Sequence, residues 1–64
     1  MLGLTAERIK RNWTQQYVAG QIGVTKAAVC MYENGRRKPS YDVLIRLEKL
    51  FGMPFQKLFK TVSE

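Results

Sequence analysis

Apolar residues recur at intervals of three and four positions along nearly the whole chain, which is the spacing of helices that each bury one face. Signals that start and stop helices divide this pattern. Thr14, Thr25 and Ser40 have side chains suited to helix N-caps, and Gly23 and Gly52 suit helix ends. We therefore predict an all-α fold of five helices, over residues 2–11, 15–22, 26–33 and 41–51 and from residue 54 onward.

The first helix and the residue that follows it carry specific expectations about burial. Leu4 and Ile9 lie on the side expected to face the core, whereas Lys10 and Arg11 lie on the side expected to face water. Trp13, at the entry to the second helix, is expected to pack in the core.

The second and third predicted helices are joined by a very short turn. Val18, Ala19 and Ile22 share one face of the second helix, and Gly23 can adopt the left-handed backbone conformation that the turn requires. This pattern over residues 15–32 is typical of a helix-turn-helix, in which the second helix of the pair is held so that it can enter a DNA major groove.

Composition and charge are consistent with this interpretation. Sixty-four residues suffice for a single domain, spanning 1–64, with one small core. The net charge is +6, and the excess is concentrated between residues 8 and 38, as expected of a surface that binds a polyanion. Asn34-Gly35 is expected to end the third helix, with Asn34 left-handed, and a basic loop follows.

The sequence lacks the residue sets that catalysis, metal binding or membrane insertion require. It contains no His, its single cysteine has no partner, and its five acidic residues show no paired spacing, so we expect no enzyme activity, metal or cofactor. The cysteine count fits a reducing compartment, and the apolar runs are too short to span a bilayer. We therefore expect a cytoplasmic protein with no membrane contact.

Several motifs at fixed spacing resemble the Xre family of DNA-binding domains, which includes the lambda and Cro repressors. They are Trp-Thr-Gln at 13–15, Gly-Val at 23–24, Tyr-Glu-Asn-Gly at 32–35 and Pro-Ser at 39–40. The resemblance implies a five-helix, lambda-repressor-like domain that binds double-stranded DNA to regulate transcription, most simply as a repressor. Two positions depart from the family pattern: Gly20 stands where a helix former is usual, and Glu48 where a small alanine is usual.

The resemblance also implies roles for individual residues. Base contacts are expected from Lys26, Ala27, Cys30 and Met31. Phosphate contacts are expected from Gln15, Gln16, Ala28, Asn34, Arg36, Arg37 and Lys38. Arg8 and Glu33 are expected to form a partly buried ion pair that orients the reading helix.

Most of these roles have a plainer alternative. Gln15 could cap its helix without touching DNA, Lys26 could bind a phosphate instead of a base, and Arg8 could be a phosphate ligand. Ala28 and Met31 could be packing residues. The lone cysteine is either a thiol sensor or an inert small residue.

The apolar stripe at the C-terminal end allows two interpretations. Its members, Phe55, Leu58, Phe59 and Val62, either close the core of a monomer or form the interface of a homodimer. A dimer would place two reading helices about 34 Å apart on a palindromic operator. In a second hypothesis for the function of the chain, the stripe binds another protein, such as a toxin or a regulator. In a third hypothesis, the chain binds nucleic acid without sequence preference.

Overall fold

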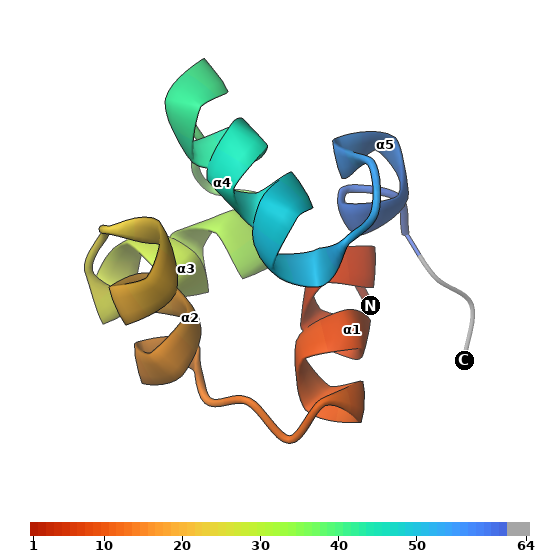
Figure 1. The fold of residues 1–64 in the computed structure, drawn as a ribbon, viewed down its shortest axis with the longest axis horizontal. Coiled ribbons are helices and arrows are strands. Elements are labelled where there is room, and N and C mark those ends of the chain that lie inside the picture. Colours follow the sequence, from red (N-terminus) through yellow and green to blue (C-terminus); the bar gives the residue numbers. More distant parts are fainter. Residues whose placement is uncertain (62–64) are drawn as a thin grey trace.

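The chain folds into short helices connected by turns and loops (Figure 1). The computed structural model describes residues 1–61. Within that range the helices are α1 (Gly3–Lys10), α2 (Gln15–Ile22), α3 (Lys26–Glu33), α4 (Tyr41–Phe51) and α5 (Phe55–Leu58). The described residues contain no strand, and one isolated antiparallel bridge joins Leu2 to Thr61. The all-α, five-helix prediction is confirmed.

Side-chain caps begin the three middle helices, as the sequence predicted. The hydroxyls of Thr14, Thr25 and Ser40 each accept a hydrogen bond from the backbone N–H three residues further on. Gly23 and Gly52 follow α2 and α4 in the left-handed conformation, with φ of 72° and 68°. Local capping chemistry therefore sets both ends of α2 and α4, and with them the geometry of the helix-turn-helix.

The ends of α1 and α3 differ in detail from the prediction. Asn34 has a right-handed backbone (φ −87°), and the left-handed residue is Gly35 (φ 73°). The N–H groups of Gly35 and Arg36 donate to the carbonyls of Tyr32 and Met31, so the turn places its left-handed residue one position later. The expectation of a left-handed Asn34 is therefore wrong.

Asn12 takes the equivalent position after α1, with φ of 59°. Its N–H donates to Ile9 O, and the N–H of Trp13 donates to Arg8 O. This is the same closing motif that ends α3. Asparagine is one of the few side chains that tolerate this conformation.

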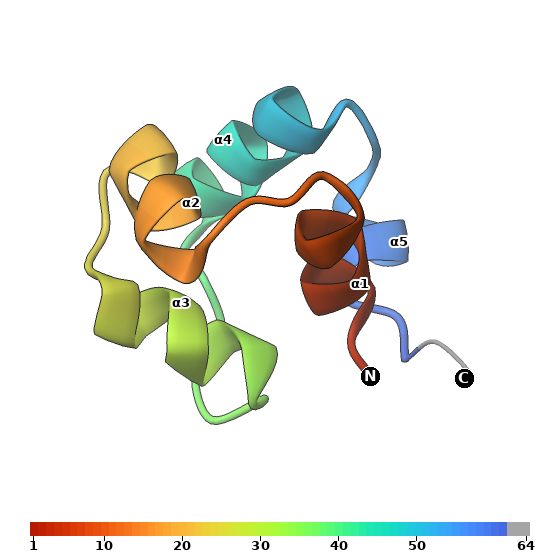
Figure 2. The same cartoon turned by 90° about the horizontal axis from the view of Figure 1, so that it is seen from below.

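α4 holds two pairs of helices together. In Figure 2, α2 and α3 lie on one side of the molecule and α1 and α5 on the other, and α4 packs against both α2 and α5. The core is formed by the buried apolar residues Leu4, Val18, Ala19, Ile22, Ala28, Val29, Tyr32, Val43, Leu47, Phe51 and Leu58. Trp13 packs against this core while remaining half-buried.

Two burial expectations for the first helix are wrong. Ile9 is 51% exposed, because α5 is only four residues long and lies against the beginning of α1. At that contact, a Cβ on Gly3 would lie 2.2 Å from the carbonyl oxygen of Lys57, so only glycine fits. Arg11, expected to face water, is half-buried, with its guanidinium over the rings of Trp13 and Phe51.

No helix among residues 1–61 is long and apolar enough to cross a membrane.

Candidate nucleic-acid interface

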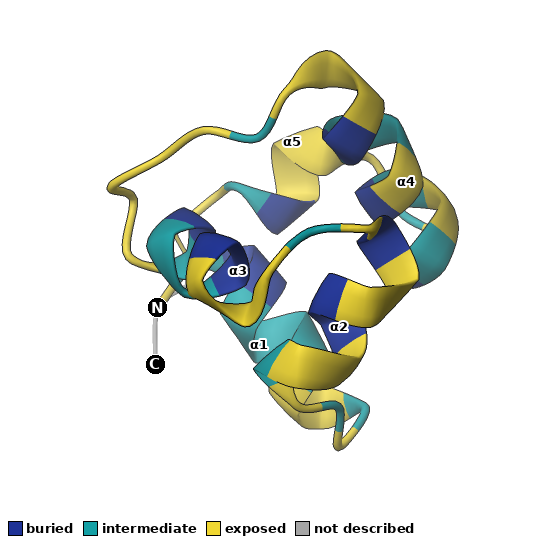
Figure 3. Cartoon of the chain, turned by 90° about the vertical axis from the view of Figure 1, so that its left-hand side faces the viewer, coloured by how far each residue is buried: buried dark blue, intermediate teal, exposed yellow. Residues whose placement is uncertain are grey.

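The outer face of α3 presents a small set of side chains to solvent. Lys26 and Ala27 are exposed in its first turn, and Cys30 and Met31, further along, are half-buried. Figure 3 shows that α3 combines exposed, intermediate and buried segments. Ala28 lies on the opposite side: it is 4% exposed, belongs to the core, and its N–H is taken by the Thr25 hydroxyl at 3.1 Å. Ala28 is therefore a packing residue, and the expectation that it contacts a phosphate is wrong.

An open depression lies beside the first turn of α3. Its lining residues come from α1, the α1–α2 connection, and the first turns of α2 and α3: Arg8, Trp13, Thr14, Gln15, Gln16 and Lys26. The depression therefore combines the N-terminal end of α2, where backbone N–H groups lack helical partners, with the ammonium group of Lys26. A negatively charged oxygen is the ligand that this combination favours.

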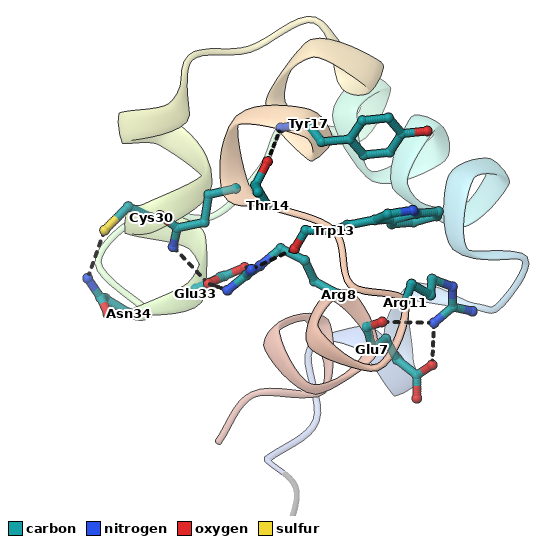
Figure 4. A network of polar contacts seen from close by, with 10 residues as sticks. Glu7, Arg8, Arg11, Trp13, Thr14, Tyr17, Cys30, Glu33 and Asn34 are labelled. Atoms are coloured by element: carbon teal, nitrogen blue, oxygen red, sulfur yellow. Dashed lines mark hydrogen bonds and ion pairs between the residues drawn. The ribbon is translucent and has the colours of Figure 1, made fainter.

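A polar network under the depression joins α1, α2 and α3 (Figure 4). Arg8 binds Glu33 in a bidentate manner, through Nε to Oε2 at 2.7 Å and through Nη2 to Oε1 at 3.2 Å. The remaining guanidinium nitrogen, Nη1, donates to Trp13 O at 2.9 Å. The side chains of Arg8 and Glu33 are only 14% and 6% exposed. The ion pair expected from the sequence is thus present, with most of its surface removed from water.

Gln15 extends this network toward the depression. Its Nε2 donates to Glu33 Oε1 at 2.9 Å, so one amide hydrogen holds the last residue of α3. A primary amide has two N–H donors, and the second is available to a ligand in the depression that Gln15 lines. The beginning of α2 and the end of α3 are therefore fixed relative to each other by one side chain.

The loop after α3 forms the other edge of this surface. Asn34, Arg36, Arg37 and Lys38 are all exposed. Asn34 Nδ2 donates to Cys30 Sγ at 3.5 Å, across one turn of the end of α3 (Figure 4). Three cations in succession, next to the outer face of α3, extend the positive surface beyond the depression.

The four residues expected at a dimer interface fall into different environments. Leu58 is fully buried in the monomer core, so it has no surface to offer a second chain, and that part of the expectation is wrong. Phe59 is half-buried against the core, and Phe55 is 39% exposed. Val62 lies outside the described residues.

Three contacts that join helices within the described residues are not predicted by any sequence pattern. Arg11 donates to Phe51 O at 3.1 Å and Arg46 donates to Ile22 O at 3.2 Å, each at the C-terminal end of another helix. Glu48, the departure from the family pattern, accepts the N–H of Phe55 at 2.8 Å through Oε2. It thereby caps the beginning of α5, where Pro54 provides no side-chain cap.

The ion pair between Glu7 and Arg11 affects the charge state of α1. The hydrogen bond from Arg11 Nη1 to Glu7 Oε1, at 2.6 Å, is the main cause that holds the pKa of Glu7 below its ordinary value of 4.5. The charge of Lys10 acts in the same direction, and partial desolvation opposes it.

Comparison with known proteins shows the family to which the chain is similar. A protein-family model described as "Helix-turn-helix" matches residues 4–58. The HTH-type transcriptional regulator AnsR of Bacillus subtilis (strain 168) is 44% identical over 55 residues, which are 86% of this chain and 47% of that protein. The cryptic phage CTXphi transcriptional repressor RstR of Vibrio cholerae is 35% identical over 51 residues, 80% of this chain and 46% of that protein.

An uncharacterized HTH-type transcriptional regulator of Methanocaldococcus jannaschii, MJ0272, is 29% identical over 52 residues, 81% of this chain and 79% of that protein. The chain spans about half the length of the two bacterial relatives above. The family match covers the described helices except for Gly3, the first residue of α1, and the resemblance noted from the sequence is confirmed. The chain belongs to the helix-turn-helix family of Xre and lambda-repressor-like transcriptional regulators.

Proposed function

We propose that the chain is a sequence-specific, double-stranded DNA-binding domain of a transcriptional regulator, with α3 in the major groove. The observation that carries this proposal is the exposed first turn of α3 next to the depression at the beginning of α2, with Lys26 belonging to both. A helix held this way can meet base edges while the adjacent helix end meets the sugar-phosphate backbone.

The phosphate contacts would lie on two sides of α3. On one side, the free N–H groups of α2, with Gln15 and Gln16, would receive a phosphate in the depression. On the other side, Arg36, Arg37 and Lys38 would meet the backbone across the groove. Contacts on both sides would fix the register of α3 without reading sequence.

Direct reading of bases would depend on few side chains. Lys26 can donate to guanine O6 and N7, and the methyl group of Ala27 can contact the methyl group of thymine. Cys30 and Met31, both half-buried, would add apolar contacts. Because so few hydrogen bonds to bases are available, DNA shape and the spacing of half-sites would supply the rest of the specificity.

We further propose that the functional unit is a homodimer that acts as a repressor on an inverted repeat. Phe55 is exposed and Phe59 half-buried at the α5 end of the molecule, which supports an apolar contact between two copies. A two-fold axis there would match half-sites about one helical turn apart. The relative RstR carries the name of a transcriptional repressor, which supports repression over activation.

The proposal is tested by selection from a pool of random duplexes at about 0.15 M salt, where weak electrostatic binding is partly screened. The purified chain should enrich an inverted repeat with half-sites about 10 base pairs apart. Enrichment of a single half-site would contradict the homodimer, and retention of all duplexes alike would contradict sequence-specific recognition.

Two substitutions separate base reading from phosphate binding on the enriched duplex. Lys26→Ala should cost about 1–3 kcal/mol and relax the preference at one base pair of each half-site. Arg37→Ala should weaken binding to all duplexes equally and reduce the slope of log affinity against log salt by about one per subunit. Lys49→Ala, on the exposed side of α4, is the matched control for the loss of one positive charge. If Lys26→Ala and Lys49→Ala have equal effects, Lys26 does not read a base.

A further inference from the structure

The two ends of α3 are held in place by different means. At its C-terminal end, Glu33 is bound by Arg8 from α1 and by Gln15 from α2. At its N-terminal end, α3 continues directly into the turn that leads back to α2. That turn therefore sets the position of Lys26 and Ala27, the two exposed residues of the first turn of α3.

A side chain from α4 lies against this turn. Arg46 Nη1 donates a hydrogen bond at 3.2 Å to the carbonyl oxygen of Ile22, the last residue of α2. The N–H groups of Gly23 and Val24 both donate to Ala19 O and close the end of α2, while Arg46 supplies a donor to the carbonyl of Ile22. A Cβ on Gly23 would lie 3.1 Å from the same nitrogen, so the guanidinium lies directly over the turn.

We propose that Arg46 is a positioning residue for DNA recognition, which fixes the α2–α3 turn to α4 and thereby sets the placement of the first turn of α3. The inference rests on the proposed function, since it concerns how that surface is held. Arg46 itself is absent from the lining of the depression and acts through the backbone of Ile22.

The physical basis is a charge-assisted hydrogen bond at a helix C-terminus. The last carbonyls of a helix lack intrahelical partners and carry partial negative charge, which a guanidinium satisfies. α4 suits the role because it packs against both α2 and α5 and links the two halves of the core. The direct hydrogen bond to Ile22 thus ties the turn to a helix that packs on both halves of the core.

The test compares Arg46→Met, which keeps the length of the side chain and removes its donors, with Lys49→Met, which removes the same charge from an exposed site on α4. Each variant is titrated with the duplex enriched by the wild-type chain and with a scrambled duplex, at a temperature where circular dichroism shows all variants folded. Arg46→Met should lose about three- to tenfold in affinity for the enriched duplex beyond the loss in Lys49→Met. On the scrambled duplex the two variants should agree, and Arg46→Lys should recover most of the loss.

Two results would overturn the assignment. Equal losses for Arg46→Met and Lys49→Met on both duplexes would reduce Arg46 to one charge among others. A greater loss for Arg46→Met that is the same on both duplexes, with a smaller salt slope, would make it a direct phosphate ligand.

A measurement without DNA separates failure of this inference from failure of the proposed function. Amide hydrogen exchange of Gly23 and Val24 should accelerate in Arg46→Met and stay at the wild-type rate in Lys49→Met, because only the first variant frees the turn. Unchanged exchange at these amides in Arg46→Met would refute the anchoring contact, whatever the DNA experiments show.

Discussion

Removal of the Glu33 carboxylate is the sharpest test of how α3 is held. Glu33 accepts two hydrogen bonds from Arg8 and one from Gln15, and its side chain is 6% exposed. In Glu33→Ala, the guanidinium of Arg8, whose side chain is only 14% exposed in the wild-type chain, loses its counter-ion. Breaking a buried pair in this way typically costs about 3–5 kcal/mol, because one charge is left without compensation.

The expected loss in this chain is somewhat smaller. Arg8 keeps its hydrogen bond to the carbonyl of Trp13, and it lies close enough to the surface to recover some hydration. We therefore expect Glu33→Ala to lower the free energy of unfolding by about 2–3 kcal/mol. For a domain of this size, this corresponds to a fall in Tm of about 10–20 °C.

Urea unfolding followed by circular dichroism measures this loss, with Arg8→Met/Glu33→Leu as the companion variant. The double variant removes both charges together and should recover most of the lost stability, because hydrophobic replacement of a buried pair is often neutral. A loss below about 1 kcal/mol in Glu33→Ala, the range of exposed ion pairs, would refute the reasoning. So would a double variant no more stable than Glu33→Ala.

Three further predictions concern positions outside this network. Gly20→Ala should raise the free energy of unfolding, measured with urea, by about 0.5–1 kcal/mol. Gly20 is an exposed helical residue, and a Cβ there would meet no atom within 4 Å. An unchanged or lower free energy of unfolding would contradict this open environment. Leu58→Ala should lower the free energy of unfolding by about 2–4 kcal/mol in the same assay at any protein concentration, because Leu58 is fully buried within one chain. A loss that depends on protein concentration would place Leu58 between chains instead. Glu7 has a folded-state pKa below its ordinary value of 4.5, so its contribution to stability is complete above that value and is lost as the pH falls through the folded pKa. Melting curves of Glu7→Gln should therefore show a smaller loss of stability than wild type as the pH is lowered below 4.5, and parallel curves would contradict the role of Arg11.

The sequence predicted the elements whose determinants are local. Thr14 and Thr25 cap the helices they were expected to cap, and α2, α3 and α4 have the predicted bounds. The Asn34-Gly35 pair shows the limit of this approach, because both residues tolerate the left-handed conformation and the dipeptide alone does not say which adopts it.

Contacts to distant backbone groups could not be predicted. Arg11 is expected to face water, and no sequence pattern singles out Arg46. Their partners are the carbonyls of Phe51 and Ile22, groups that every residue possesses. Glu48 differs from the small residue that is usual in the family, which marks the position as unusual. Only the fold shows that its carboxylate accepts a hydrogen bond from the N–H of Phe55 at the beginning of α5.

Ile9 was assigned to the core because helical periodicity ranks faces without measuring how much of each face the neighbouring helices cover. Ile9 is exposed because α5 is four residues long and covers only the beginning of α1. Among the expected site residues, Ala28 and Leu58 failed for a related reason, since apolar side chains at helical spacing fit an interface and a core equally well.

The central claim is that α3 and the beginning of α2 form the surface that meets DNA. The most direct test is a titration of the ¹⁵N-labelled chain with the duplex enriched by selection, in which every backbone amide is followed by NMR. The account predicts that the amides that shift or broaden first are those of residues 14–16, 26–31 and 34–38, and that those of α5 change only where two copies meet. Early shifts confined to α1 and α5, with α3 unchanged, would contradict it.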